Sequence, residues 1–182
     1  LLMSSAEGSS IIKHVPLTQQ MEVMDFGAGT GLVSSHLVPL VSNIIAVDIS
    51  QAMLDKLITK SELQDKVEAV CQDITSNPLD KKFDLIVSAM ALHHVDNTNE
   101  LLNTFAQHLT CGGKIALADL DKEDGDFHPE DSEGIYHAGF ERDALQEALE
   151  NSGFNDIQFY TIHTIHKNTK QYPMFMVVAT KQ

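Results

Sequence analysis

Three glycines stand at alternate positions in the stretch VMDFGAGTGLVSSHL, between an apolar run that ends in an acid and a segment with helical spacing. Glycine permits positive φ angles and lets a ligand lie directly against the backbone. Gly27, Gly29 and Gly31 therefore predict a backbone site for a bound molecule. A tight strand-to-helix turn without a ligand would use the same residues, so the glycines alone leave both interpretations open.

A second acid, Asp48, ends the apolar run NIIAVD and lies about 20 positions after Gly27, the distance at which an acid accepts from ribose hydroxyls. A cofactor that contains a nucleoside is thus indicated. A dinucleotide loop has the pattern GxGxxG, but Leu32 occupies the place of its third glycine. Asp25, just before the loop, suits a cation or an ammonium group better than a pyrophosphate. The residues favour a positively charged nucleoside over a nicotinamide dinucleotide.

Strand and helix signals alternate along the chain, which predicts a parallel, doubly wound α/β sheet. Thr30, Ser50 and Asn97 are the expected helix N-caps, and Cys111-Gly112-Gly113 is expected to end the helix that Asn97 begins. No helix signal separates the last two apolar runs, so we expect them to form an antiparallel hairpin whose final strand is interior. The expected strands are 21–26, 43–49, 66–73, 83–90, 114–120, 155–165 and 172–180.

The composition restricts the partners and the compartment. Lysine and arginine total 12 against 26 acids, a net charge of −14, which repels nucleic acid and anionic membrane surfaces. A chain of 182 residues suits one domain, which we assign to residues 21–182. Residues 1–20 are interpreted as an incomplete N-terminal segment that contains the linker-like SSAEGSS. Two cysteines without CxxC spacing, and no apolar run of roughly 20 residues, predict a cytoplasmic protein.

Five motifs occur in a fixed order: VMDFGAGTG, IIAVDISQAMLDK, VCQDI, FDLIVSAMALHHV and LTCGGKIALADL. Together with the closing hairpin they resemble class I S-adenosylmethionine-dependent methyltransferases over about residues 21–180, and within these the small-molecule branch that includes quinone-biosynthesis methyltransferases. The resemblance implies a Rossmann-like sheet of seven strands in the order 3-2-1-4-5-7-6, with strand 7 antiparallel. It also implies S-adenosylmethionine as cofactor and S-adenosylhomocysteine as product.

The same resemblance implies the cofactor contacts. For two of these residues an alternative without a cofactor contact stays open: Met53 belongs to a helix core, and Asp73 only forms a turn. In the implied set the methionine moiety lies against Gly27, Ala28 and Gly29, its ammonium group against Asp25, the ribose against Asp48, the adenine against Ile49, Met53, Asp73 and Ile74, and the sulfonium against Ser88 and Met90.

The acceptor side is indicated by histidines and aromatic residues. Methyl transfer is an in-line displacement that needs a general base only when the acceptor carries a proton at working pH. His94 is the candidate base, and His93 either lines the acceptor pocket or packs locally. His128, Tyr136, His137 and Phe140 are the acceptor candidates in and after the acidic loop 121–133. This loop cannot pack tightly on an acidic protein without partners, so we expect it to be mobile when the site is empty.

Three features narrow the function. The sequence SAMA replaces the (D/N)PP(Y/F) tetrapeptide of amino-methylating nucleic-acid enzymes, so the acceptor is expected to be a small molecule. The acidic loop does not match a calcium-binding pattern, so no metal is expected. A protein that binds the cofactor without catalysis is one alternative, and a nicotinamide-dependent oxidoreductase, disfavoured by Leu32 and Asp25, is another.

Overall fold

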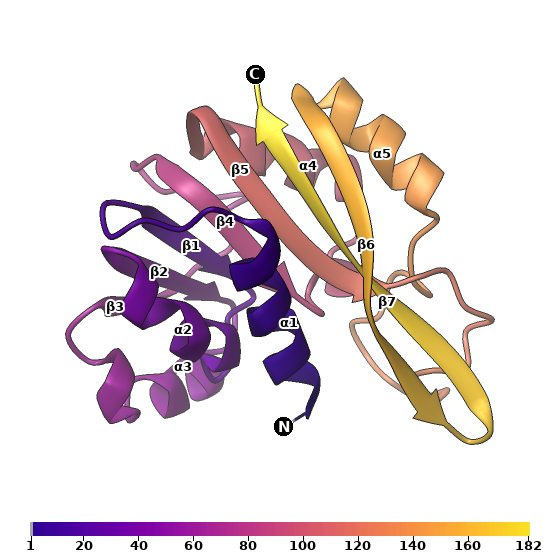
Figure 1. The fold of residues 1–182 in the computed structure, drawn as a ribbon. Helices are drawn as coiled ribbons and strands as arrows, with labels where there is room; N and C mark the ends of the chain where they lie inside the picture. The colour runs from indigo at the N-terminus through magenta and orange to yellow at the C-terminus, as the bar shows by residue number, and fades with distance from the viewer. Residues whose placement is uncertain (1) are drawn as a thin grey trace.

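The computed structural model describes residues 2–182, and its centre is a seven-stranded sheet in the order β3-β2-β1-β4-β5-β7-β6 (Figure 1). β7 runs antiparallel to its two neighbours, β5 and β6, and the remaining strand pairs are parallel. The predicted strand order and hairpin are confirmed. The strands are β1 (Glu22–Phe26), β2 (Asn43–Asp48), β3 (Val67–Cys71), β4 (Phe83–Ala89), β5 (Leu109–Leu120), β6 (Phe154–Lys167) and β7 (Lys170–Lys181).

Helices cover both faces of the sheet. Figure 1 shows α1, α2 and α3 on one face and α4 and α5 on the other. Because both faces are covered, the central strands are buried along almost their whole length. The helices are α1 (Leu2–His14), α2 (Leu32–Leu37), α3 (Gln51–Leu57), α4 (Thr98–Gln107) and α5 (Arg142–Asn151), and the 3-10 turns are η1 (Val38–Leu40), η2 (Ser61–Leu63) and η3 (Leu92–His94).

Two apolar clusters hold these layers together. One joins Leu101 of α4 and Leu145 of α5 to Ile86 of β4. The other joins α1, α2 and α3 to the opposite face, where Leu85 and Val87 of the same strand are buried. Alternate residues of β4 therefore serve opposite cores, as the period of a strand requires.

The helix ends agree with the sequence only in part. Ser50 accepts from the Met53 N–H at 3.3 Å and Asn97 from the Glu100 N–H at 3.0 Å, so both predicted caps are confirmed. The prediction of Thr30 as an N-cap is wrong, because Gly31 occupies the N-cap position of α2 in a left-handed conformation and no side chain bonds to the end of the helix. The predicted end at Cys111 is also wrong, since α4 stops at Gln107 and β5 begins at Leu109.

The N-terminal segment is a helix, so the linker interpretation of residues 4–10 is wrong. The small residues there permit close packing: a Cβ placed on Gly8 would lie 2.5 Å from the His36 ring of α2. Ile11 and Val15 are buried in the core on this face. Residues that look like a linker in the sequence thus bring α1 against the sheet.

The acidic loop has the partners that it needs in order to pack on an acidic protein. Lys170 of β7 bonds to Asp126, and Tyr172 donates to the same carboxylate at 2.9 Å. Glu123 accepts from three successive backbone N–H groups, of Gly125, Asp126 and Phe127. The β6–β7 hairpin therefore anchors the loop by interactions between segments far apart in sequence.

Gly31→Ala tests the packing between α2 and α3. A Cβ at Gly31, where φ is +84°, would lie 2.9 Å from Leu57 and Leu63 side-chain carbons. We expect a loss of about 2–4 kcal/mol in the free energy of unfolding, from left-handed strain plus overpacking. Gly112→Ala, with φ +80° and no described atom within 4 Å, is the control and should cost only about 1–2 kcal/mol. Equal losses in urea unfolding would contradict this account.

Candidate functional site

A cavity of about 740 Å³ opens at the carboxyl ends of β1, β2 and β4. The residues that line it come from the loops after these strands and after β3, from the start of α4 and from the segment after the acidic loop. Nine predicted site residues lie in its wall: Gly27, Gly29, Asp48, Ile49, Met53, Asp73, Met90, His94 and Tyr136. Other polar residues also line the cavity but were not predicted as site residues, namely Ser50, Gln72, Thr75, Asp96, Asn97 and Glu100.

The glycines of the first loop serve different purposes. Gly27 has φ +66°, and a Cβ there would lie 2.4 Å from the Ala91 Cβ, so glycine is required for contact with the segment after β4. Gly29 has φ +56°, and a Cβ there would meet no described atom within 4 Å. The space over Gly29 therefore admits a ligand against the backbone, which fits a bound nucleoside cofactor.

Asp48 joins two loops at the floor of the cavity. One carboxylate oxygen accepts from the Gly29 N–H at 2.8 Å and the other from the Ser50 N–H at 2.9 Å. An ionised carboxylate has about four acceptor positions, so about two remain for a ligand. The arrangement suits the paired hydroxyls of a ribose.

Two apolar side chains border the cavity beside Asp48. Ile49 is 77% exposed and Met53 is 43% exposed, which is unusual for such residues. Met53 is therefore not part of a helix core. An exposed apolar pair at the wall of a cavity fits the faces of a flat ring.

Asp73 stands opposite on the loop after β3. One of its carboxylate oxygens accepts from both the N–H and the hydroxyl of Thr75, at 3.0 and 2.6 Å. The hydroxyl bond is the main reason why the pKa of Asp73 is below its ordinary value. Asp73 thus forms a turn and also presents an ionised acceptor to the cavity.

Four other residues predicted to contact the cofactor do not line the cavity, namely Asp25, Ala28, Ile74 and Ser88. Asp25 is 2% exposed and accepts from the Ser34 hydroxyl at 2.6 Å, so it binds the first turns of α2. Burial raises the pKa of Asp25 to about 7, against the opposing effect of Ser34. The Ala28 N–H donates to the Val47 carbonyl. Ile74 is a core residue, and Ser88 is buried with no partner in the described chain for its hydroxyl.

Met90 has a strained backbone at the end of β4. Its φ is +56°, which costs a residue other than glycine about 1–3 kcal/mol. The Met90 N–H donates to the Ala118 carbonyl at 2.9 Å, and Met90 lines the cavity. This left-handed conformation lets the chain turn from the end of β4 into η3 beside the cavity.

His93 forms a buried pair with Asp119, a residue that the sequence analysis did not select. The His93 Nδ1 lies 3.0 Å from both carboxylate oxygens of Asp119, and the His93 backbone N–H donates to one of them at 3.2 Å. Asp119 also accepts from the Leu120 N–H at 2.8 Å. An acid at the end of the strand KIALADL was the available signal, but its partner is 26 residues away.

His94 lies at the cavity surface beside this pair. Its Nδ1 donates to the Gly134 carbonyl at 2.8 Å, because a carbonyl can only accept. In the neutral ring the other nitrogen, Nε2, is therefore an acceptor. The ring centroids of His93 and His94 are 4.2 Å apart, and those of His93 and His128 are 4.9 Å apart.

The other acceptor candidates separate into two groups. Tyr136 is 57% exposed and lines the cavity. His128 lies beside His93 with its ring tilted by 38°, and burial lowers the pKa of His128 from the ordinary value. His137 donates from Nε2 to the carbonyls of Val95 and Asp96, and Phe140 packs on Phe175 in the core. The structure thus brings Tyr136 to the cavity and directs His137 and Phe140 elsewhere.

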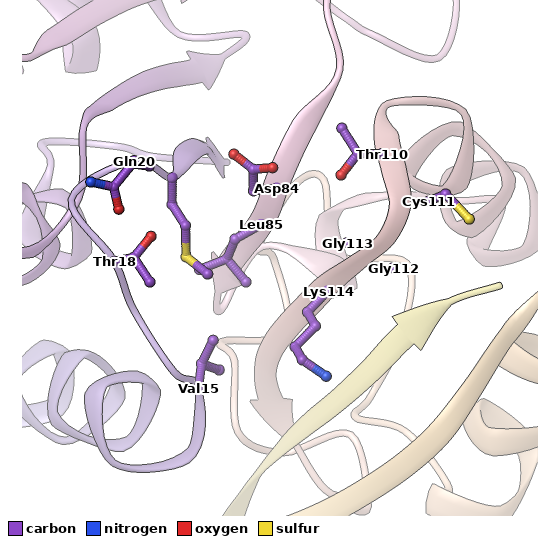
Figure 2. A pocket seen from close by; sticks show the side chains of 11 residues that line it. Val15, Thr18, Gln20, Asp84, Leu85, Thr110, Cys111, Gly112, Gly113 and Lys114 are labelled. Carbon is purple, nitrogen blue, oxygen red and sulfur yellow. The ribbon is translucent and has the colours of Figure 1, made fainter.

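A smaller cavity of about 320 Å³ lies at the opposite edge of the sheet. Figure 2 shows Thr18, Asp84 and Lys114 among its lining residues. Asp84 accepts from the Glu22 N–H at 2.9 Å, and Lys114 donates to the Thr180 hydroxyl at 2.7 Å. The charged groups of this second cavity are therefore already paired.

Among residues 2–182 no helix combines the length and the apolar character that crossing a bilayer requires. In the same described part of the chain, no three His, Cys, Asp or Glu side chains are placed so that they could hold a metal ion.

The fold and the cavity define an α/β protein with an open cavity at the carboxyl edge of its sheet, the place where proteins of this architecture bind their ligands. The methyltransferase domain family matches residues 9–159, and the chain belongs to that family. The chain is 27% identical over 175 residues to an uncharacterized methyltransferase of Schizosaccharomyces pombe, an alignment that covers 87% of this chain. It spans 62% of the length of that relative.

Solved structures share the fold. The YcgJ protein of Bacillus subtilis has a TM-score of 0.80 at 16% identity, and the match covers 98% of this chain and 99% of that one. Phosphoethanolamine N-methyltransferase 2 of Haemonchus contortus, solved with phosphomonomethylethanolamine and S-adenosylhomocysteine, has a TM-score of 0.77 at 15% identity. That match covers 96% of this chain and 52% of the Haemonchus chain.

Asp119→Asn tests the buried pair. The substitution weakens three hydrogen bonds to a buried carboxylate, and bonds to charged groups contribute about 1.5–3 kcal/mol each. We expect the free energy of unfolding to fall by about 2–4 kcal/mol, measured in urea. Asp131→Asn, at an exposed position of the acidic loop, is the control and should change it by less than about 0.5 kcal/mol. If Asp119→Asn left the free energy of unfolding unchanged, the pair would not be structural.

Proposed function

We propose that the protein is an S-adenosylmethionine-dependent methyltransferase that acts on a small-molecule acceptor. The observation that carries this proposal is the cavity in which open Gly29, the free acceptor positions of Asp48 and the exposed pair Ile49 and Met53 meet. Membership of the methyltransferase domain family supports it. When bound, S-adenosylmethionine supplies a methyl group already activated on a sulfonium.

The chain would hold this cofactor with the residues that the resemblance implies. Asp48 would accept from the ribose hydroxyls, and Ile49 and Met53 would cover the adenine. Asp73, which is ionised because Thr75 stabilises its charge, would accept from the adenine amino group. Gly29 would leave room for the methionine moiety, and Gly27 would hold the loop against Ala91, with Met90 at the reacting end of the cavity.

His94 is proposed as the general base. The Gly134 carbonyl fixes the proton on Nδ1, so Nε2 of the neutral ring is the nitrogen that can take a proton from an acceptor. A base is useful only where the acceptor atom carries an acidic proton, as in a phenol or an activated carbon. Tyr136, which lines the cavity, and His128, which lies beside His93, would border the acceptor.

The acceptor class and the compartment rest on charge and composition. A net charge of −14 opposes binding to nucleic acid and supports a small molecule. The Haemonchus enzyme of similar fold was solved with a small-molecule phosphomonomethylethanolamine, which agrees with this proposal. Cys71 and Cys111 are free and exposed, which suits the reducing cytoplasm that we propose as the compartment.

A thermal-shift series tests the proposal against both alternatives. S-adenosylmethionine and S-adenosylhomocysteine should raise the melting temperature, whereas NADH and NADPH should not, because a ligand stabilises only the state that it binds. Transfer of labelled methyl groups into a metabolite extract should follow. A shift with NADH alone would favour an oxidoreductase, and cofactor affinity without transfer to any acceptor would favour a binding protein.

Asp48→Ala should weaken S-adenosylhomocysteine binding at least about tenfold, because a hydrogen-bonded charged group contributes about 1.5–3 kcal/mol. The loss includes the tie between the loops that hold Gly29 and Ser50. Titration calorimetry measures the affinity. Asp55→Ala, on the exposed side of α3, is the control, and an unchanged affinity for Asp48→Ala would remove Asp48 from the site.

His94→Gln should lower the rate of methyl transfer about 10²- to 10⁴-fold, the usual contribution of a general base. Glutamine can still donate to the Gly134 carbonyl, so the local fold should remain. Affinity for S-adenosylhomocysteine should stay within about twofold, roughly 0.4 kcal/mol. His166→Gln, at an exposed position of β6, is the control. A full transfer rate with His94→Gln would exclude this residue as the base.

A further inference from the structure

The end of the β6–β7 hairpin has no role in the site described so far. The pairing of β7 with β5 ends at Leu120 and Met174, whereas its pairing with β6 continues to Lys167 and Lys170. The hairpin therefore extends beyond β5 as a ribbon of two strands (Figure 1). Such a ribbon is marginally stable by itself in water, so it requires packing against another segment.

The acidic loop supplies this packing through two consecutive residues. Asp126 accepts from Lys170 and from the Tyr172 hydroxyl, the latter at 2.9 Å. The Phe127 carbonyl accepts from Lys167, whose ammonium group also lies 4.9 Å from the centre of the Phe127 ring. The rings of Phe127 and Tyr172 meet edge to face, with centroids 5.0 Å apart. We call these five residues the loop clamp.

The residue that follows the clamp reaches the histidines of the candidate site. The His128 ring meets the Phe127 ring edge to face at 4.9 Å and lies 4.9 Å from the His93 ring on its other side. The ring of His94, the proposed base, lies 4.2 Å from that of His93. Neighbouring rings thus connect Tyr172 with the proposed base.

The backbone that follows the acidic loop bonds to the same two histidines. The Gly134 carbonyl accepts from His94 Nδ1 at 2.8 Å, and the Tyr136 N–H donates to the His93 carbonyl at 2.9 Å. A displacement of the loop would disturb both bonds. The direction of the His94 ring therefore depends on where the loop is held.

The clamp also supports the wall of the cavity. Tyr172 is 5% exposed and belongs to a small apolar cluster with Leu120 and Met174. Met90 and Phe127 pack against this cluster. Because Met90 lines the cavity, the cluster lies directly behind the wall at the end of β4.

We propose that Tyr172 is a positioning residue for methyl transfer, because the clamp holds the acidic loop and thereby fixes His94 and Met90 at the reacting end of the cavity. This inference rests on the proposed function. Tyr172 does not itself line the cavity, so it acts through the loop and through the apolar cluster. The end of the hairpin is then part of the machinery of the acceptor side.

Two substitutions test the clamp, each with a matched control. Tyr172→Phe deletes the hydroxyl that donates to Asp126 and keeps the ring in the apolar cluster. Tyr160→Phe deletes the same group from β6 and is its control. Asp126→Ala removes the carboxylate at the centre of the clamp. Asp124→Ala is its control, because the side chain of Asp124 is 90% exposed and lies 3.9 Å from Lys170.

The first measurement separates transfer from cofactor binding. Tyr172→Phe and Asp126→Ala should each lower the transfer of labelled methyl groups into a metabolite extract about 3- to 10-fold, because the base and the cavity wall are less well placed. Affinity for S-adenosylhomocysteine should stay within about twofold, roughly 0.4 kcal/mol, by calorimetry. Tyr160→Phe and Asp124→Ala should change neither quantity.

Nuclear magnetic resonance of the histidine rings gives a second measurement, which needs no acceptor. Burial, then His93 and then His94 lower the pKa of His128, against the smaller opposing effects of Glu123 and Asp119. Release of the loop should expose the His128 ring, so the pKa of His128 should rise toward its ordinary value in both clamp variants and in neither control. A clamp that only stabilised the fold would leave this titration unchanged in the folded variants.

Failures of the two proposals are distinguishable. If the unaltered protein binds neither S-adenosylmethionine nor S-adenosylhomocysteine, or transfers no methyl group, the proposed function fails and the role of Tyr172 in it fails too. If the unaltered protein binds and transfers, full transfer rates or an unchanged His128 titration in both clamp variants overturn only the inference about Tyr172. An equal loss of S-adenosylhomocysteine affinity and of transfer would also overturn it. Should Tyr172→Phe not fold, the surface variant Asp126→Ala decides by the same outcomes.

Discussion

The contact of the Asp48 carboxylate with two backbone N–H groups determines how the site is assembled. Parallel pairing of β1 and β2 brings their carboxyl ends to one edge of the sheet. Asp48 then joins the glycine loop to the start of α3, through Gly29 and Ser50. The cavity owes its shape to this tie, because the open face of Gly29 and the exposed side chains of Ile49 and Met53 are positioned by the same carboxylate.

Patterns local in sequence were sufficient for most of the fold. Buried strands, two of the three helix caps and the final hairpin follow from apolar spacing and from Ser50 and Asn97, whose bonds span three residues. The strand order was implied by the resemblance to a known family. Local signals failed for α1, where small residues pack on α2, and at Thr30, where a left-handed glycine took the cap position.

The candidate site was predictable where its residues follow strands. Gly29, Asp48 and Asp73 could be selected because strand ends meet at one edge of a parallel sheet. Asp119 could not, since its importance comes from burial and from its partner His93, which is 26 residues away in the sequence. His137 and Phe140 share the composition of an acceptor wall with Tyr136, but backbone carbonyls and the core occupy their side chains.

The anchoring of the acidic loop by the β6–β7 hairpin has a consequence for the two halves of the cavity. Asp126 and Lys170 meet at the surface, where dissolved ions screen charges over roughly 8–10 Å. Asp48, by contrast, bonds to backbone N–H groups, which carry no net charge to be screened. Rising ionic strength therefore weakens the anchoring of the acidic loop first and leaves the hydrogen bonds of Asp48 in place. The two halves of one cavity differ in their sensitivity to salt.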